Sequence, residues 1–226
     1  MWDGQPREWD LRGKRFAVVM AANPHTESGR RFRIPDMLAN RADVWNLGDV
    51  LTGRDDLFAL SFLENALTAN PHLAPHAPQI RTDLEALLRR AEGGPDTAPL
   101  SHPYPADELD RILAVLAGLL RARRTVLDVN RAYIASAAQA DHIRTEPPFL
   151  LQGSYRNMNK IAKRLAPVMD DTELDALITD HYRAEAQALG AAAEAQLLKL
   201  AELRGTLTPA LAERWDTVKS GFRHTD

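Results

Sequence analysis

From residue 55 onward, apolar positions recur at three- and four-residue steps, the period of an amphipathic helix. Ser154 is a favourable N-cap, and Asp170 with Glu173 three residues later has the pattern of a capping box. Glycines and prolines between residues 93 and 104 indicate a linker. The pattern predicts helices over about 55–68, 79–92 and 105–141, a short one after Ser154, a long one over 170–204 and a last one from 209.

The helix expected over 105–141 carries a leucine seam with a coiled-coil-like spacing, on which Arg123 and Asn130 also fall. The helix expected over 170–204 is rich in alanine in its middle and contains Gly190, and small residues let helices approach closely. The two long segments therefore predict an antiparallel helical hairpin beside the short helix that begins after Ser154. The apolar seam residues are Leu109, Leu113, Leu116, Leu120, Leu127 and Ile134.

The N-terminal part has a different pattern. Residues 16–20 form a wholly apolar run, which is typical of a strand covered on both faces in a parallel sheet. The run is followed by Asn23 and Pro24. Ligands of open α/β sheets bind beyond the carboxyl ends of the strands, so Asn23 lies where a ligand is expected.

The composition is that of an ordinary globular protein, with 45% apolar and 26% charged residues. A net charge of −3 gives no global basic signature of nucleic-acid binding. The chain has no cysteine, which excludes disulfides and thiolate metal sites. The N-terminus lacks the apolar core of a signal peptide, and no run approaches the roughly 18 apolar residues of a membrane span. We therefore expect a soluble, cytoplasmic protein without a membrane partner.

Residues 15–46 resemble the second half of an AAA+ ATPase core, closest to the MoxR-like branch. In those proteins a sensor-1 strand ends in Asn-Pro, and a glycine-containing loop leads to a Leu-Pro-Glu-(three residues)-Asp-Arg element. The matching residues here are Asn23-Pro24, Gly29, and Ile34-Pro35-Asp36 through Asn40-Arg41, with Asn40 in place of the usual Asp. More narrowly, the segments 34–51 and 147–164 are similar to the C-terminal part of a bacterial AAA+ family described as DNA repair ATPases.

The resemblance implies a mainly α chain: the remnant of an α/β AAA+ core, followed by a helical lid that carries the long antiparallel hairpin. It implies the end of the core in residues 1–70, a connector in 71–104 and the lid in 105–226. It also implies ATP and Mg²⁺ as cofactors of the full-length protein, and a homo-oligomeric ring that remodels a protein partner. No Gly-x₄-Gly-Lys-Ser/Thr loop occurs in the sequence, so the phosphate-binding half is expected to precede Met1, and this chain alone is expected to be inactive.

Three residues take site roles from the resemblance. Asn23 corresponds to the sensor-1 residue that orients the attacking water, and Arg41 to the arginine finger that acts on a neighbouring subunit's nucleotide. Arg156 corresponds to the sensor-2 arginine of the lid, although MoxR-like lids have proline where Tyr155 stands. Each residue also has a purely structural interpretation. Asn23 could close a turn, Arg41 could form a surface ion pair, and the aliphatic part of the Arg156 side chain could cover apolar surface of the lid.

Other patterns, formed by basic residues and histidines, are weaker evidence for a functional site. Basic clusters at 30–33, 121–124 and 160–164 could meet nucleic-acid phosphates, but such clusters are more often solvated faces. His72 and His76 have the spacing of metal ligands on a helix, yet the prolines around them argue against that helix, and we expect no metal site. The alternative to an ATPase portion is a non-enzymatic helical interaction module that binds a partner or regulates an intact ATPase.

Overall fold

The computed structural model describes residues 53–95 and 98–223, together with the isolated positions 10, 12–15, 19, 37, 40, 41 and 43. The described part is mainly helical and contains no strand, which confirms the predicted fold class at that level. The α-helices are α2 (Asp55–Leu67), α3 (Ala77–Ala91), α4 (Ala106–Ala138), α5 (Tyr155–Ala162), α6 (Asp171–Gln187), α7 (Ala193–Leu203) and α8 (Pro209–Arg223). Short 3₁₀ turns lie at Ala74–His76, Asp141–Ile143 and Gly190–Ala192.

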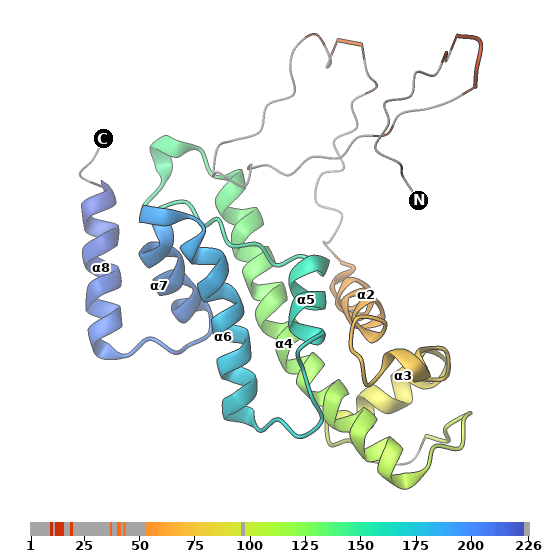
Figure 1. Ribbon diagram of the computed structural model, residues 1–226. Coiled ribbons are helices and arrows are strands. Elements are labelled where there is room, and N and C mark those ends of the chain that lie inside the picture. The colour runs from red at the N-terminus through yellow and green to blue at the C-terminus, as the bar shows by residue number, and fades with distance from the viewer. Residues whose placement is uncertain are drawn as a thin grey trace.

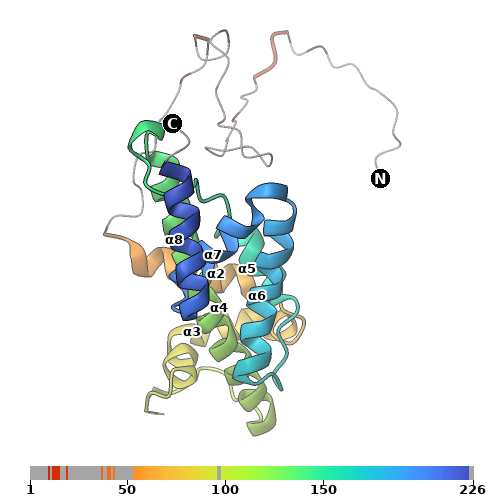
Figure 2. The ribbon, with the colours of Figure 1, turned by 90° about the vertical axis from the view of Figure 1, so that its left-hand side faces the viewer.

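The long helix α4 is the axis of the molecule. It contacts α2, α3 and α5 on one side and α6 and α7 on the other (Figure 1). α8 lies at the edge and packs on α7 (Figure 2). One apolar core runs from Phe62 on α2 to Leu200 on α7. The core therefore continues across the two predicted domain boundaries, which follow residues 70 and 104.

Two buried polar residues, Asn70 and Asp83, form hydrogen bonds that hold irregular segments in place beside α2, α3 and α4. Asn70 is fully buried, and its Oδ1 accepts from the backbone N–H groups of His72 and Leu73 (2.9 and 3.1 Å). The carboxylate of Asp83 on α3 accepts from the N–H groups of Ser101 and His102 (2.7 and 3.1 Å). The predicted linker at 93–104 is therefore irregular, as expected, but the described part of it is tied to α3.

The ionisation of Asp83 follows from these contacts. Burial by itself raises the pKa of this carboxyl, but the hydrogen bonds from Ser101, His102 and Tyr104 outweigh it and hold the pKa below the ordinary value. Burial and the nearby Asp83 charge raise the pKa of Tyr104 to about 12. The carboxylate stays charged and the phenol stays a hydrogen-bond donor near neutral pH.

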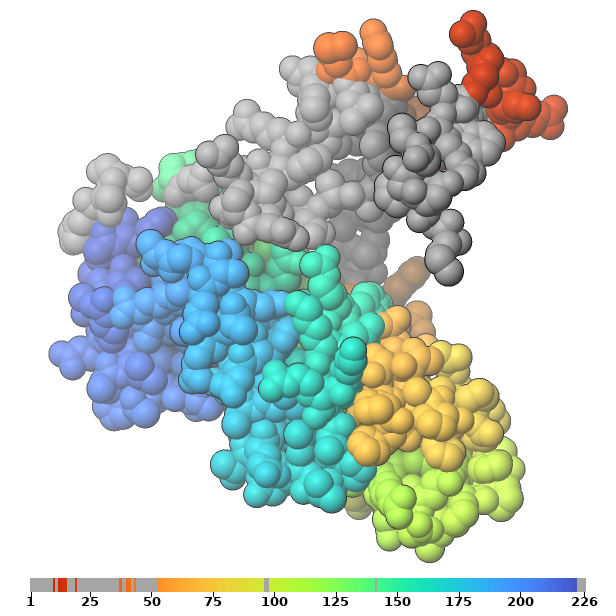
Figure 3. All heavy atoms as spheres, in the orientation of Figure 1, coloured from red at the N-terminus to blue at the C-terminus, as the bar shows by residue number. Residues whose placement is uncertain are grey.

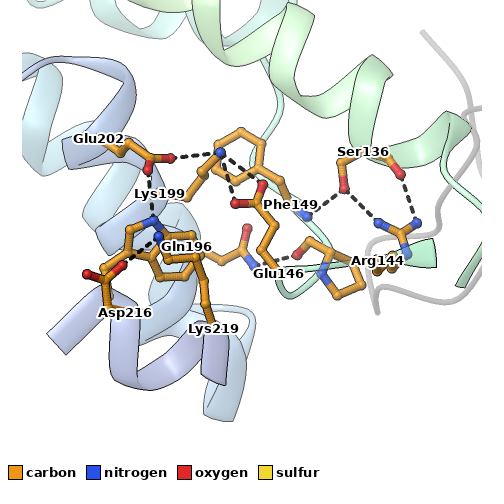
Figure 4. Close-up of polar contacts among 11 residues, drawn as sticks. Ser136, Arg144, Glu146, Phe149, Gln196, Lys199, Glu202, Asp216 and Lys219 are labelled. Atoms are coloured by element: carbon orange, nitrogen blue, oxygen red, sulfur yellow. Dashed lines mark hydrogen bonds and ion pairs between the residues drawn. The ribbon is translucent and has the colours of Figure 1, made fainter. Parts of the chain in front are cut away.

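A second polar cluster joins the last helices to the extended segment after α4 (Figure 4). Lys199 on α7 forms ion pairs with Glu146 (2.9 Å) and Glu202 (2.8 Å). Glu202 also accepts from the indole N–H of Trp215, which anchors α8 and is only 1% exposed. Gln196 accepts from the N–H of Leu150 (2.7 Å) and donates to the carbonyl of Pro148 (2.9 Å).

The expected single helix over 170–204 is wrong in its middle. α6 begins at the predicted capping box of Asp170 and Glu173, but it ends at Gln187, and α7 begins only at Ala193. Gly190 between them has φ +60°, a left-handed conformation that glycine adopts without strain. α6 and α7 therefore fold back on each other as an antiparallel pair, while α6 runs in the same direction as α4 (Figure 1).

The leucine seam expected on α4 is also only partly correct. Leu116 and Leu127 are buried, but Ile134 is 46% exposed. Many of the buried residues of α4 lie beside the predicted seam and not on it. Helices cover α4 on two sides, so its apolar surface is wider than a single seam. The buried residues of α4 are Ile112, Val115, Leu116, Leu119, Ala122, Val126, Leu127, Val129, Tyr133 and Ala137.

The apolar run expected to form a buried strand lies almost wholly outside the described residues. Its one described member, Val19, is 92% exposed and is not in a strand, so the burial expected of this run is not seen at that position. A buried strand needs paired neighbours on the sheet, and the described residues supply none.

Candidate functional site

The three predicted site residues have different outcomes. Asn23 lies outside the described residues. Arg41 lies in a turn, is exposed, and forms no hydrogen bond or ion pair with another described residue. Arg156 is exposed in the first turn of α5, where its sequence position predicts it. No interaction among the described residues brings Arg41 and Arg156 together, so the site that can be built here is the one around Arg156.

The N-terminus of α5 is closed by its own side chains. The hydroxyl of Ser154 accepts from the backbone N–H of Asn157, while Oδ1 of Asn157 accepts from the N–H of Ser154 (3.2 Å), completing a capping box. This arrangement satisfies two backbone donors that a bound anion would otherwise use. Anion binding at this helix therefore depends on the cationic side chains more than on the N-terminal amides.

Two clefts flank α5, and both are lined by Arg156, Lys160 and Lys163. Figure 3 shows this face, with α5 lying between α2 and α6. The cleft toward α2 has a volume of about 710 Å³ and is also lined by Asn65, Ala69, Tyr155 and Asn159. The cleft toward α6 has a volume of about 690 Å³ and includes Gln152, Ser154, Asn157, Arg164, Asp180, His181 and Glu185 in its walls.

Four cations, Arg156, Lys160, Lys163 and Arg164, form the α5 basic surface. Lys160 lies 3.5 Å from a carboxylate oxygen of Glu185. The side chains of the other three form no hydrogen bond or ion pair with any residue of the described ranges, and all three are exposed. This surface therefore carries positive charge that the described protein does not neutralise.

A buried polar network supports the cleft between α5 and α6. Nδ2 of Asn157 donates to Glu185 Oε2 (2.7 Å) and lies 3.1 Å from Nε2 of His181. With Nε2 as the acceptor, His181 is neutral and carries its proton on Nδ1. Burial lowers the pKa of His181, the charge of Glu185 opposes this, and the cations Lys160 and Arg164 add to the lowering. The network holds Glu185 beside Lys160 without placing a charge on the imidazole near neutral pH.

The C-terminal end of α5 is fixed by Asn70 from the turn after α2. Its Nδ2 donates to the carbonyl oxygens of Ala162 (2.8 Å) and Leu165 (2.9 Å). These contacts satisfy carbonyl groups that the helix end leaves without helical partners. Together with the N-terminal cap, they hold the short helix α5 rigidly between its neighbours.

Sequence reasoning missed Asn70, Asn157 and His181 as members of this site. Asn157 was detectable in principle, because it lies three residues after the N-cap Ser154, the position of the reciprocal partner in a capping box. Asn70 and His181 gave no such local signal, since their partners lie 92 and 24 residues away in the sequence.

The site offers cationic contacts and amides but no metal-binding group. No set of three or more His, Asp or Glu side chains that could hold a metal ion occurs in the described part of the chain. His76 instead lies 3.4 Å from Glu108. Within the same residues, none of the helices is sufficiently long and apolar to cross a membrane.

Comparisons with family models, with curated proteins and with solved structures found no match to this chain.

Proposed function

We propose that residues 105–226 are the lid of an AAA+ ATPase and that Arg156 contacts a phosphate group of the bound nucleotide. One observation carries this proposal: Arg156 is exposed and unpaired among the described residues, on a helix held at both ends, with a cleft on either side. A guanidinium in that position can donate a charge-assisted hydrogen bond to a phosphate oxygen. Its free charge separates this residue from the arginines elsewhere in the fold that form ion pairs.

In this proposal the chain contributes part of a nucleotide site. Arg156 supplies the phosphate contact, and Lys160, held beside Glu185, adds positive potential in the same cleft. The cradle for the phosphates and the ligands of Mg²⁺ come from residues outside the described ones. By the resemblance, Asn23 orients the attacking water and Arg41 acts across a subunit interface of a ring, where hydrolysis of ATP drives remodelling of a partner.

The test is weak nucleotide binding by the whole chain at low ionic strength, measured as the fluorescence anisotropy of a dye-labelled ATP. Without a phosphate-binding loop, this chain is expected to hold the nucleotide only through cations such as Arg156, and not to hydrolyse it. We expect Arg156→Ala to weaken binding by about tenfold, since hydrogen bonds to charged groups contribute about 1.5–3 kcal/mol. Arg81→Ala is the matched control, because Arg81 is an exposed arginine of α3 without a hydrogen bond or ion pair to another described residue. Equal binding by the wild type and Arg156→Ala would refute the role of Arg156.

Absence of any nucleotide response, in binding or in thermal unfolding, would favour the non-enzymatic helical module instead. Helices α2 to α7 share one core, so such a module would remain folded and would be expected to bind a protein partner.

A further inference from the structure

We infer that the α5 basic surface binds the phosphate backbone of a single-stranded nucleic acid, independently of the nucleotide contact proposed for Arg156. The inference rests on three observations: the length of the surface, the absence of a structural role for Lys163 and Arg164, and the chemistry of the cleft toward α2.

The cations extend farther than one phosphate group requires. Arg156, Lys160 and Lys163 are spaced by four and three residues, and Arg164 follows directly. At a rise of 1.5 Å per residue, Arg156 and the C-cap residue Lys163 are about 10 Å apart along the helix direction, and Arg164 follows in the turn after α5. A polymer with a charge on every unit can meet both ends of this surface at once, whereas a single phosphate near Arg156 leaves Lys163 and Arg164 unused.

Lys163 and Arg164 also have no evident structural task. Cations near a helix C-terminus often bind its last carbonyl groups, but here Asn70 donates to the carbonyls of Ala162 and Leu165. Neither cation forms an ion pair with any residue whose position the structure gives. By contrast, Arg121 on α4 pairs with Asp171 and Asp175.

The clefts favour a nucleic acid over an acidic peptide. The cleft toward α2 presents the ring of Tyr155, which is 38% exposed, beside Asn65 and Asn159, whose amides are joined by a 2.7 Å hydrogen bond. Tyr155 is held in place by stacking on Phe62 (ring centroids 4.2 Å apart) and by a 2.6 Å hydrogen bond with Ser61. Aromatic side chains beside a row of basic residues are typical of single-strand binding. A carboxylate peptide would use only the charges.

The experiment is a titration of the whole chain, without nucleotide, into a fluorescein-labelled oligodeoxythymidine at several salt concentrations. We expect binding that weakens with salt, and we expect Lys163→Ala/Arg164→Ala to weaken it by about tenfold or more at low salt. Loss of two phosphate contacts should also reduce the slope of log affinity against log salt concentration by about 1.4, because each contact to a single strand contributes about 0.7. Arg156 is unchanged in this variant, so ATP binding should be retained and the two proposals can fail separately.

The control Arg81→Ala/Arg124→Ala removes the same charge from two other exposed arginines that have no hydrogen bond or ion pair to a described residue. We expect it to bind like the wild type, and Lys163→Arg/Arg164→Lys to retain binding as well. Circular dichroism melts would show that each variant is folded. The inference is overturned if the chain does not bind the oligonucleotide, if the control loses as much affinity, or if duplex DNA or polyglutamate of equal charge competes equally well.

Discussion

Two basic clusters of similar composition have opposite environments in this molecule. On α4, Arg121 forms ion pairs with Asp171 and Asp175, and Arg123 donates to the carbonyl of Ala59. On α5 and directly after it, the side chains of Arg156, Lys163 and Arg164 form no such contact with the described residues. Arg121 and Arg123 of the first cluster join helices to each other, whereas three of the four cations of the second leave their charge available to a ligand.

The difference comes from position in the fold. α4 is covered by helices on two sides, so long side chains leaving its edges reach neighbouring carboxylates and carbonyls. α5 is a short helix whose buried face is made by Met158, Ile161 and Ala162, while its cations leave from the opposite side. A basic cluster therefore indicates a ligand only where the fold leaves most of its cations without a carboxylate partner.

The largest expected effect comes from moving α5 off α4. A Cβ atom on Gly153 would lie 1.9 Å from the carbonyl oxygen of Val126 and 2.4 Å from the N of Asn130, both backbone atoms of α4. We expect Gly153→Ala to destabilise the fold by about 3 kcal/mol or more, since the backbone itself must move. Denaturant unfolding measures the change. Gly221→Ala on α8 is the control, because a Cβ there meets nothing within 4 Å, and a loss of similar size in that variant would contradict the argument.

The next largest effect is expected from a substitution that removes hydrogen bonds holding α5 and leaves the charges of the α5 basic surface unchanged. Asn70→Ala removes all four hydrogen bonds of a fully buried side chain and leaves the carbonyls of Ala162 and Leu165 without this donor. We expect a loss of about 2 kcal/mol in the free energy of unfolding, together with weaker ligand binding by the α5 basic surface. Thr68→Ala, which removes an exposed hydroxyl bonded to Asn65, should change stability little. Unchanged stability in Asn70→Ala would show that α5 does not depend on this contact.

The sequence predicted much of the helical architecture but not the contacts that give it a site. Local signals placed the ends of α2, α3, α5 and α8 within a few residues, because caps and apolar periodicity act over one or two turns. The break at Gly190 was missed because alanine-rich flanks favour helix and only the tertiary packing of α7 selects the turn. The sequence also could not show that Arg121 forms ion pairs with Asp171 and Asp175, or that the side chain of Arg164 forms none with the described residues. Both outcomes depend on helices that are distant in sequence.

A direct comparison of the two clusters is expected to give a smaller effect. Arg121→Ala should lower stability by about 0.5–1 kcal/mol, a modest value because its ion pairs are partly exposed to solvent, with Arg121 itself 37% exposed. Arg164→Ala should leave stability unchanged within error while it weakens oligonucleotide binding. Thermal unfolding and anisotropy on the same two variants measure both quantities. If Arg164→Ala proves to be the destabilising change, the assignment of structural and binding roles to the two clusters is reversed.

The smallest expected effect is a pH dependence confined to the α5 side. Burial holds the pKa of His181 below its ordinary value of 6.5, so the unfolded chain takes up this proton at a higher pH than the native protein does. Stability should therefore fall as the pH drops below about 6.5, and the loss should level off below the native pKa. The depressed carboxyl pKa values of Asp83 and Glu202 act in a lower pH window, because their ordinary values are 3.8 and 4.5. Melting temperatures of the wild type and His181→Gln between pH 7 and 5 isolate the imidazole: the variant should lose this dependence, and a slope equal to that of the wild type would assign it to other groups.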